Sequence, residues 1–144
     1  MVLKNKFAIG CLVQWYEIDI IEEYVNSVKQ SLSQLENPEN VIVHFTLTTN
    51  QELERIDETQ IDMKTIEKKF ESMMTREWRF RITSELVTIA DYRRWFNDYY
   101  CEKVDVLMWG ETDSLIPTQT FEILDGLHSQ VKNQTPKYVS FFST

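Results

Sequence analysis

The chain is poor in the residues that interrupt regular structure, since its 144 residues include only three glycines and three prolines. This composition excludes a collagen-like or low-complexity segment and a Pro/Gly-rich linker, and the length indicates one domain over residues 1–144. There are only two cysteines, Cys11 and Cys101, and neither has metal-ligand spacing. We interpret both as buried free thiols in a reducing compartment.

Long apolar runs and basic runs are also missing. No apolar run approaches the roughly 18–20 residues that a membrane span needs, and the N-terminus does not resemble a signal peptide. We therefore expect no membrane span and a cytoplasmic location. The net charge of −8 predicts that the chain does not bind nucleic acid, and a phosphate-bearing ligand would need a bridging divalent cation.

What the sequence does contain is an alternation of apolar strand and amphipathic helix patterns. It predicts a three-layer α/β domain with a mostly parallel (mixed) sheet. The expected strands are Phe7–Val13, Val41–Leu47, Glu77–Ile82, Val104–Trp109 and Tyr138–Phe142. The expected helices are Asp19–Leu35, one containing Ile66 and Phe70, Leu86–Cys101, and one that begins at Pro117.

The apolar content of each strand predicts its place in the sheet. Phe7–Val13, Val41–Leu47 and Val104–Trp109 are nearly continuous apolar runs, which are typical of central strands buried on both faces. Glu77–Ile82 alternates apolar and charged residues, so we expect a strand with one wet face near a sheet edge, its Arg79 and Arg81 solvated.

Polar residues then appear directly after a buried strand and before a helix, in the turn Gly110-Glu111-Thr112-Asp113-Ser114. In open α/β sheets, ligands bind at this carboxyl end of the strands. Two carboxylates one residue apart, Glu111 and Asp113, can share one hard cation, and Mg²⁺ takes its other ligands from water and substrate phosphates. The alternative is a solvated acidic turn in which Asp113 or Ser114 caps the next helix.

The residues around this turn resemble the family 2-like glycosyltransferases of the GT-A fold. The stretch 104–117 is similar to that family's hydrophobic strand, DxD motif, short apolar step and proline before a helix. The opening of the chain is similar too, because Gln14-Trp15-Tyr16-Glu17 follows the first strand where the family often has a Tyr-Asn-Glu-like turn.

This resemblance implies that the chain binds a nucleotide-diphosphate sugar through Mn²⁺ or Mg²⁺, with transfer to an unidentified acceptor hydroxyl as the parent chemistry. Glu111 and Asp113 would hold the metal and diphosphate, and Gln14, Trp15, Tyr16 and Glu17 would line the nucleotide pocket. Arg93 stands where the family often has a basic residue near the diphosphate, although a solvated helix face is the alternative. The resemblance assigns no catalytic residue.

The sequence departs from the family pattern in four places. Glu111 stands at the first acidic position of the DxD motif, a change that lengthens the side chain by one methylene, and Tyr16 replaces the usual asparagine. Thr46-Leu47-Thr48-Thr49-Asn50 lacks the aspartate that usually contacts the nucleoside, and the family's acceptor-binding half would lie beyond Thr144. We therefore expect this chain alone to bind a donor without transferring it. Two alternatives stay open: a non-catalytic GT-A-like binding or assembly domain, and an unrelated doubly wound α/β protein.

Two aromatic residues and the two histidines are also candidates for a binding role. Trp15 and Tyr16 either stack on a nucleobase or pack the sheet edge. His44 and His128 have no ligand-spaced partner, so we interpret both as structural residues.

Overall fold

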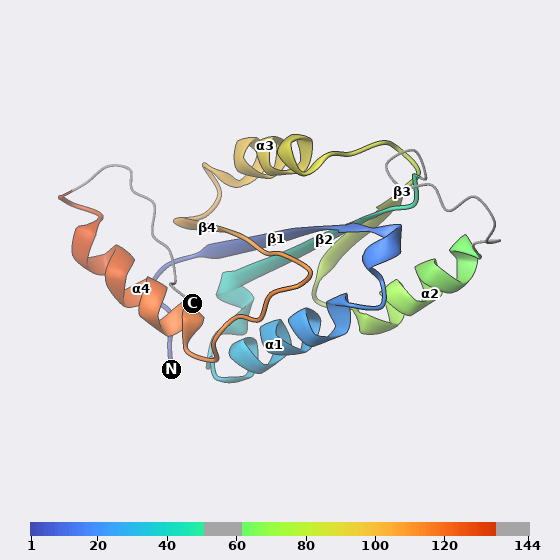
Figure 1. Cartoon of the computed structure of the whole chain (residues 1–144). Coiled ribbons are helices and arrows are strands. Elements are labelled where there is room, and N and C mark those ends of the chain that lie inside the picture. Colours follow the sequence, from blue (N-terminus) through green and yellow to red (C-terminus); the bar gives the residue numbers. More distant parts are fainter. Residues whose placement is uncertain (51–61, 135–144) are drawn as a thin grey trace.

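The computed structural model describes residues 1–50 and 62–134, which form an α/β fold (Figure 1). Its sheet has four parallel strands in the order β3-β2-β1-β4. These strands are β1 (Phe7–Gln14), β2 (Val41–Thr48), β3 (Arg79–Thr83) and β4 (Val106–Trp109). The helices are α1 (Ile21–Ser33), α2 (Met63–Met73), α3 (Ile89–Tyr100) and α4 (Thr120–Val131), with short 3₁₀ turns at Trp15–Glu17 and Pro38–Asn40.

Helices cover both faces of the sheet, and the alternation of side chains along β1 decides which residues each helix meets. α1 and α2 lie on one face and α3 on the other (Figure 1). Phe7, Ile9, Cys11 and Val13 join the core under α1 and α2, while Ala8 and Leu12 pack under α3. Successive residues of a strand point to opposite faces, so an apolar run such as β1 supplies both cores.

Helix boundaries follow the local capping chemistry. Asp62 accepts hydrogen bonds from the backbone N–H groups of Lys64 and Thr65 and so begins α2. Thr88 and Asp91 form a reciprocal capping box that begins α3. The prediction of a helix from Leu86 was therefore three residues early, and Leu86 is exposed.

The buried polar network at the chain start joins two distant segments. Asp125 of α4 is buried, and its carboxylate accepts hydrogen bonds from the backbone N–H groups of Lys4 and Asn5. The side-chain amide of Asn5 also donates to this carboxylate. Asp125 therefore fixes the segment that leads into β1.

The predicted α/β class and mostly parallel sheet are confirmed, and the edge position of β3 is also confirmed. All four described strands are parallel, so the described sheet is not mixed. β4 lies at the end of the described sheet and is therefore not central in it; its first three side chains are half-buried and Trp109 is exposed. The predicted strand Tyr138–Phe142 lies outside the described residues.

Two further predictions were wrong. Cys101 is exposed at the C-terminal cap of α3, where the helix ends, whereas Cys11 is buried in β1; both thiols are free. Pro117 is not in the first turn of α4, because its carbonyl accepts a hydrogen bond from the N–H of Thr120, where the helix begins.

None of the helices within the described ranges combines the length and apolar character needed to cross a bilayer.

Candidate functional site

A cleft of about 390 Å³ opens at the carboxyl ends of β1 and β4. The chain leaves β1 through α1 on one face of the sheet, whereas it reaches β4 from α3 on the other face. Such a reversal of connection between neighbouring parallel strands is the topological switch point where α/β proteins bind ligands. The cleft is lined by Leu12, Gln14, Tyr16, Glu17, Ile20, Thr88, Ile89, Gly110, Glu111, Thr112 and Asp113.

One wall of the cleft is the turn that follows β1. The Glu17 carboxylate accepts a hydrogen bond from the backbone N–H of Gln14 at 2.9 Å, which closes the turn. The side-chain amide nitrogen of Gln14 donates to the Val87 carbonyl at 3.1 Å. The Gln14 side-chain oxygen is buried and has no hydrogen-bond partner among the described residues, an arrangement that costs free energy.

The other wall is the turn that follows β4, and Gly110 sets its position. The Gly110 N–H donates to the Gly10 carbonyl at 2.8 Å, which extends the pairing of β4 with β1 by one residue. A Cβ at Gly110 would lie 1.7 Å from the Tyr24 hydroxyl, so no larger residue fits without a shift. The turn then closes when the Ser114 N–H donates to the Glu111 carbonyl at 3.2 Å.

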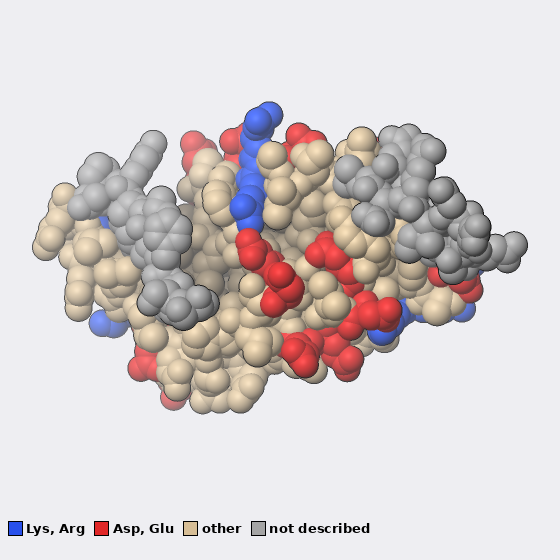
Figure 2. Space-filling view, in the orientation of Figure 1, with Lys and Arg blue, Asp and Glu red and all other residues tan. Residues whose placement is uncertain are grey.

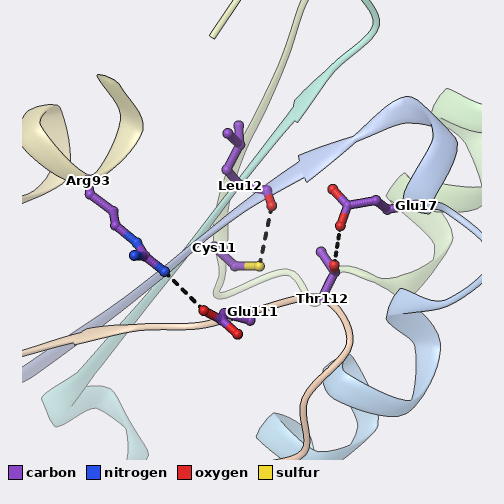
Figure 3. Close-up of polar contacts among 6 residues, drawn as sticks. All are labelled: Cys11, Leu12, Glu17, Arg93, Glu111 and Thr112. Carbon is purple, nitrogen blue, oxygen red and sulfur yellow. Dashed lines mark hydrogen bonds and ion pairs between the residues drawn. The ribbon is translucent and has the colours of Figure 1, made fainter. Parts of the chain in front are cut away.

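The two walls are joined by a direct hydrogen bond. The Thr112 hydroxyl donates to the second carboxylate oxygen of Glu17 (Figure 3). Thr112 is only 5% exposed, whereas its neighbours Glu111 and Asp113 are exposed and line the cleft. Because Thr112 points inward, the two flanking carboxylates are left at the cleft surface.

Arg93 of α3 supplies the positive charge nearest to these carboxylates. Its guanidinium forms an ion pair with Glu111 at 3.2 Å and lies 4.8 Å from the ring centre of Trp109. The Trp109 indole N–H in turn donates to the Asn97 side chain at 3.0 Å. Figure 2 shows acidic side chains gathered across the middle of this face, next to a column of basic atoms.

The structure brings five of the seven sequence-predicted site residues to one cleft: Gln14, Tyr16, Glu17, Glu111 and Asp113. Arg93 contacts Glu111 without lining the cleft. Trp15 is buried and packs edge-to-face on Tyr16 at 5.5 Å, so it belongs to the core; Tyr16 is 44% exposed at the cleft.

Sequence reasoning missed the apolar and hydroxyl part of the lining. Of these residues, Leu12, Ile20, Ile89 and Thr112 carry no motif of their own, whereas Thr88 does. The Thr88-x-x-Asp91 capping box is the one signal that would have located the start of α3 at this end of the sheet.

His44 lies on β2 away from the cleft lining and packs under α3. Its Nδ1 is 2.8 Å from the Tyr92 hydroxyl, and the side chain is 7% exposed. Burial, the largest cause, and the nearby positive charges of Arg81 and Arg79 together lower the pKa of His44 to about 4. His44 is therefore a neutral packing residue near pH 7, consistent with the structural interpretation.

The donor set of the cleft limits which metal it can hold. Within residues 1–50 and 62–134 there is no group of three His, Cys, Asp or Glu side chains arranged to enclose a metal ion. Glu111 and Asp113 fit Mg²⁺ or Mn²⁺ only in the mode in which the ion takes its remaining ligands from water and phosphate.

Comparison of the chain with protein-family models, with curated proteins and with solved structures finds no match. The resemblance to GT-A-type glycosyltransferases is therefore carried by the sequence motifs alone.

Proposed function

We propose that this chain binds a nucleoside-diphosphate sugar together with Mn²⁺ or Mg²⁺ in the cleft between β1 and β4, with glycosyl transfer as the parent chemistry. The observation that carries the proposal is the shared cleft: Glu111 and Asp113 line the same surface as Gln14 and Tyr16. The cleft also lies at the switch point of the parallel sheet, where nucleotide ligands commonly bind.

Charge explains why a cation belongs to this proposal. The described lining holds three carboxylates, those of Glu17, Glu111 and Asp113, and neither lysine nor arginine. A diphosphate would meet repulsion here unless a divalent ion lay between the carboxylates and the phosphates. The ion would also stabilise the negative charge that develops on a diphosphate leaving group.

The apolar and aromatic part of the lining suits a nucleoside. Tyr16 offers a half-exposed ring for stacking, and the side chains of Leu12, Ile20 and Ile89 add apolar surface to the same cleft. A ligand that combines a flat ring with a metal-bound phosphate matches this set of lining residues.

A non-catalytic binding domain is the second candidate, and the bonding of Glu17 favours it. Both Glu17 oxygens already accept hydrogen bonds, from the Gln14 N–H and the Thr112 hydroxyl. If Glu111 and Asp113 hold the metal, the described lining offers no further carboxylate to deprotonate an acceptor hydroxyl.

Titration calorimetry with uridine and guanosine diphosphates, with and without Mn²⁺, tests the proposal. We expect binding of one nucleotide only in the presence of Mn²⁺, and loss of that binding in Asp113→Asn. The control is Asp98→Asn, since Asp98 is an exposed carboxylate in the C-terminal half of α3, away from the cleft. Equal nucleotide binding with and without metal, or unchanged binding by Asp113→Asn, would contradict the proposal.

A further inference from the structure

Arg93 and a divalent cation would compete for the same carboxylate. In the described structure the guanidinium contacts Oε1 of Glu111 at 3.2 Å, and this is the one ion pair that involves a described cleft carboxylate. A cation placed on Glu111 would stand beside the positive charge of Arg93. The two charges repel each other, so metal binding favours release of Arg93 from Glu111.

Arg93 is able to leave Glu111 at small cost. The pair is partly solvated, with the Glu111 side chain 56% exposed, and such pairs contribute little stability. The Trp109 ring gives the guanidinium a surface on which it can remain while its hydrogen-bond partner changes. Trp109 itself is held by Asn97, which lies one helical turn after Arg93 on α3.

We propose that Arg93 is an exchange residue that holds Glu111 in the ligand-free cleft and transfers to the phosphate oxygens of the ligand when a metal ion takes Glu111. This inference rests on the proposed function. The diphosphate accepts the displaced guanidinium through charge-assisted hydrogen bonds, for which the arginine fork is well suited. Metal alone lacks that compensation, so metal and diphosphate bind with positive coupling, and each raises the affinity of the other by the same factor.

The test measures Mn²⁺ binding by water-proton relaxation, first without and then with uridine diphosphate, on the full chain. Arg93→Gln removes the competitor of the metal. It should bind Mn²⁺ alone about two- to five-fold more tightly than the unmodified chain, the range expected for an exposed ion pair. It should also bind uridine diphosphate more weakly at saturating Mn²⁺, so the coupling factor falls. Arg93→Lys, which keeps the charge, should stay close to the unmodified chain in Mn²⁺ affinity.

Arg94→Gln is the matched control, because Arg94 is an exposed neighbour on α3 with the same charge and no ion pair to a described cleft residue. It should bind Mn²⁺ like the unmodified chain, which separates loss of the Glu111 pair from loss of nearby charge. Tryptophan fluorescence provides a second readout, since movement of Arg93 alters the surroundings of Trp109. The change on adding Mn²⁺ and nucleotide should be smaller in Trp109→Phe, in which only the other tryptophans, including Trp15 beside Tyr16, still report.

The outcomes separate this inference from the proposed function. If Arg93→Gln binds Mn²⁺ no more tightly than the unmodified chain while nucleotide binding stays Mn²⁺-dependent, the exchange is wrong and the proposed function stands. If Arg94→Gln tightens Mn²⁺ binding as much as Arg93→Gln, general charge explains the effect and the exchange is again wrong. If the unmodified chain shows no Mn²⁺-dependent nucleotide binding, both fail.

Discussion

The Thr112 hydroxyl donates a hydrogen bond to the Glu17 carboxylate and thereby joins the turn after β1 to the turn after β4. These residues are 95 positions apart in the chain, yet they lie side by side because β1 and β4 are parallel neighbours. The same Glu17 carboxylate closes the β1 turn through the Gln14 N–H. One carboxylate therefore fixes both walls of the cleft relative to each other.

Removing this bond should destabilise the fold modestly and loosen the cleft. We expect Thr112→Val to lower the free energy of unfolding by about 1–3 kcal/mol, because a partly buried carboxylate oxygen loses its partner while side-chain volume is kept. Urea denaturation measures the change. Thr118→Val, a change of the same kind in the segment between this turn and α4, should have an effect below about 0.5 kcal/mol. Equal effects of the two substitutions would show that the bond to Glu17 contributes nothing specific.

Two glycines should respond in opposite directions to alanine. Gly110→Ala places a methyl group against the Tyr24 ring and hydroxyl, so we expect a loss of about 1–3 kcal/mol from strain in the packed core. Gly126→Ala meets nothing within 4 Å and lies inside α4, so the better helix propensity of alanine should add about 0.5–1 kcal/mol.

Thermal unfolding of both variants, together with Gly110→Ala in a Tyr24→Phe background, separates the causes. The double variant should recover part of the loss, because the closest approach is to the Tyr24 hydroxyl oxygen. A neutral Gly110→Ala would mean that the backbone after β4 does not pass as close to Tyr24 as the structure places it.

Protonation of His44 should make stability depend on pH in a defined window. Its pKa is lowered from 6.5 to about 4 in the folded chain, so between these values the unfolded chain binds the proton more tightly. Stability therefore falls as the pH decreases from about 6.5 towards 4, by up to about 3 kcal/mol in total from this group.

Chemical denaturation between pH 7.5 and 4.5 reveals this contribution as the difference between the unmodified chain and His44→Asn, which does not titrate there. The slope of stability against pH should be smaller in the variant. Parallel pH profiles would show that His44 has an ordinary pKa in the folded chain.

The sequence predicted those elements whose pattern is local and repeated. β1 and β2 are apolar runs because both of their faces are buried, and α1 has an apolar stripe because one of its sides is buried. Each of these patterns can be recognised within the segment itself. The placement of Glu111 and Asp113 beside Gln14 and Tyr16 was also predictable, since the carboxyl ends of parallel strands meet at one edge.

Features that depend on partners far along the chain could not be predicted in this way. The apolar stripe of α4 does not indicate that Asp125 accepts hydrogen bonds from the backbone N–H groups of Lys4 and Asn5. The pairing of Arg93 with Glu111 depends on the distance between α3 and the β4 turn, which no spacing in the sequence encodes. The position of β4 at the end of the described sheet was missed because an apolar run occurs in central strands and also in end strands that helices cover. The run alone does not distinguish the two positions.

The central claim is that metal and nucleotide share the cleft between β1 and β4. Paramagnetic broadening of backbone amide signals by substoichiometric Mn²⁺, in the presence of uridine diphosphate, tests it most directly because the effect falls steeply with distance from the ion. The account predicts the strongest broadening at residues 110–113, weaker broadening at residues 14–17, and weaker broadening still at Met63–Met73 of α2. Strongest broadening anywhere else in the described chain, or none at the turn after β4, would contradict it.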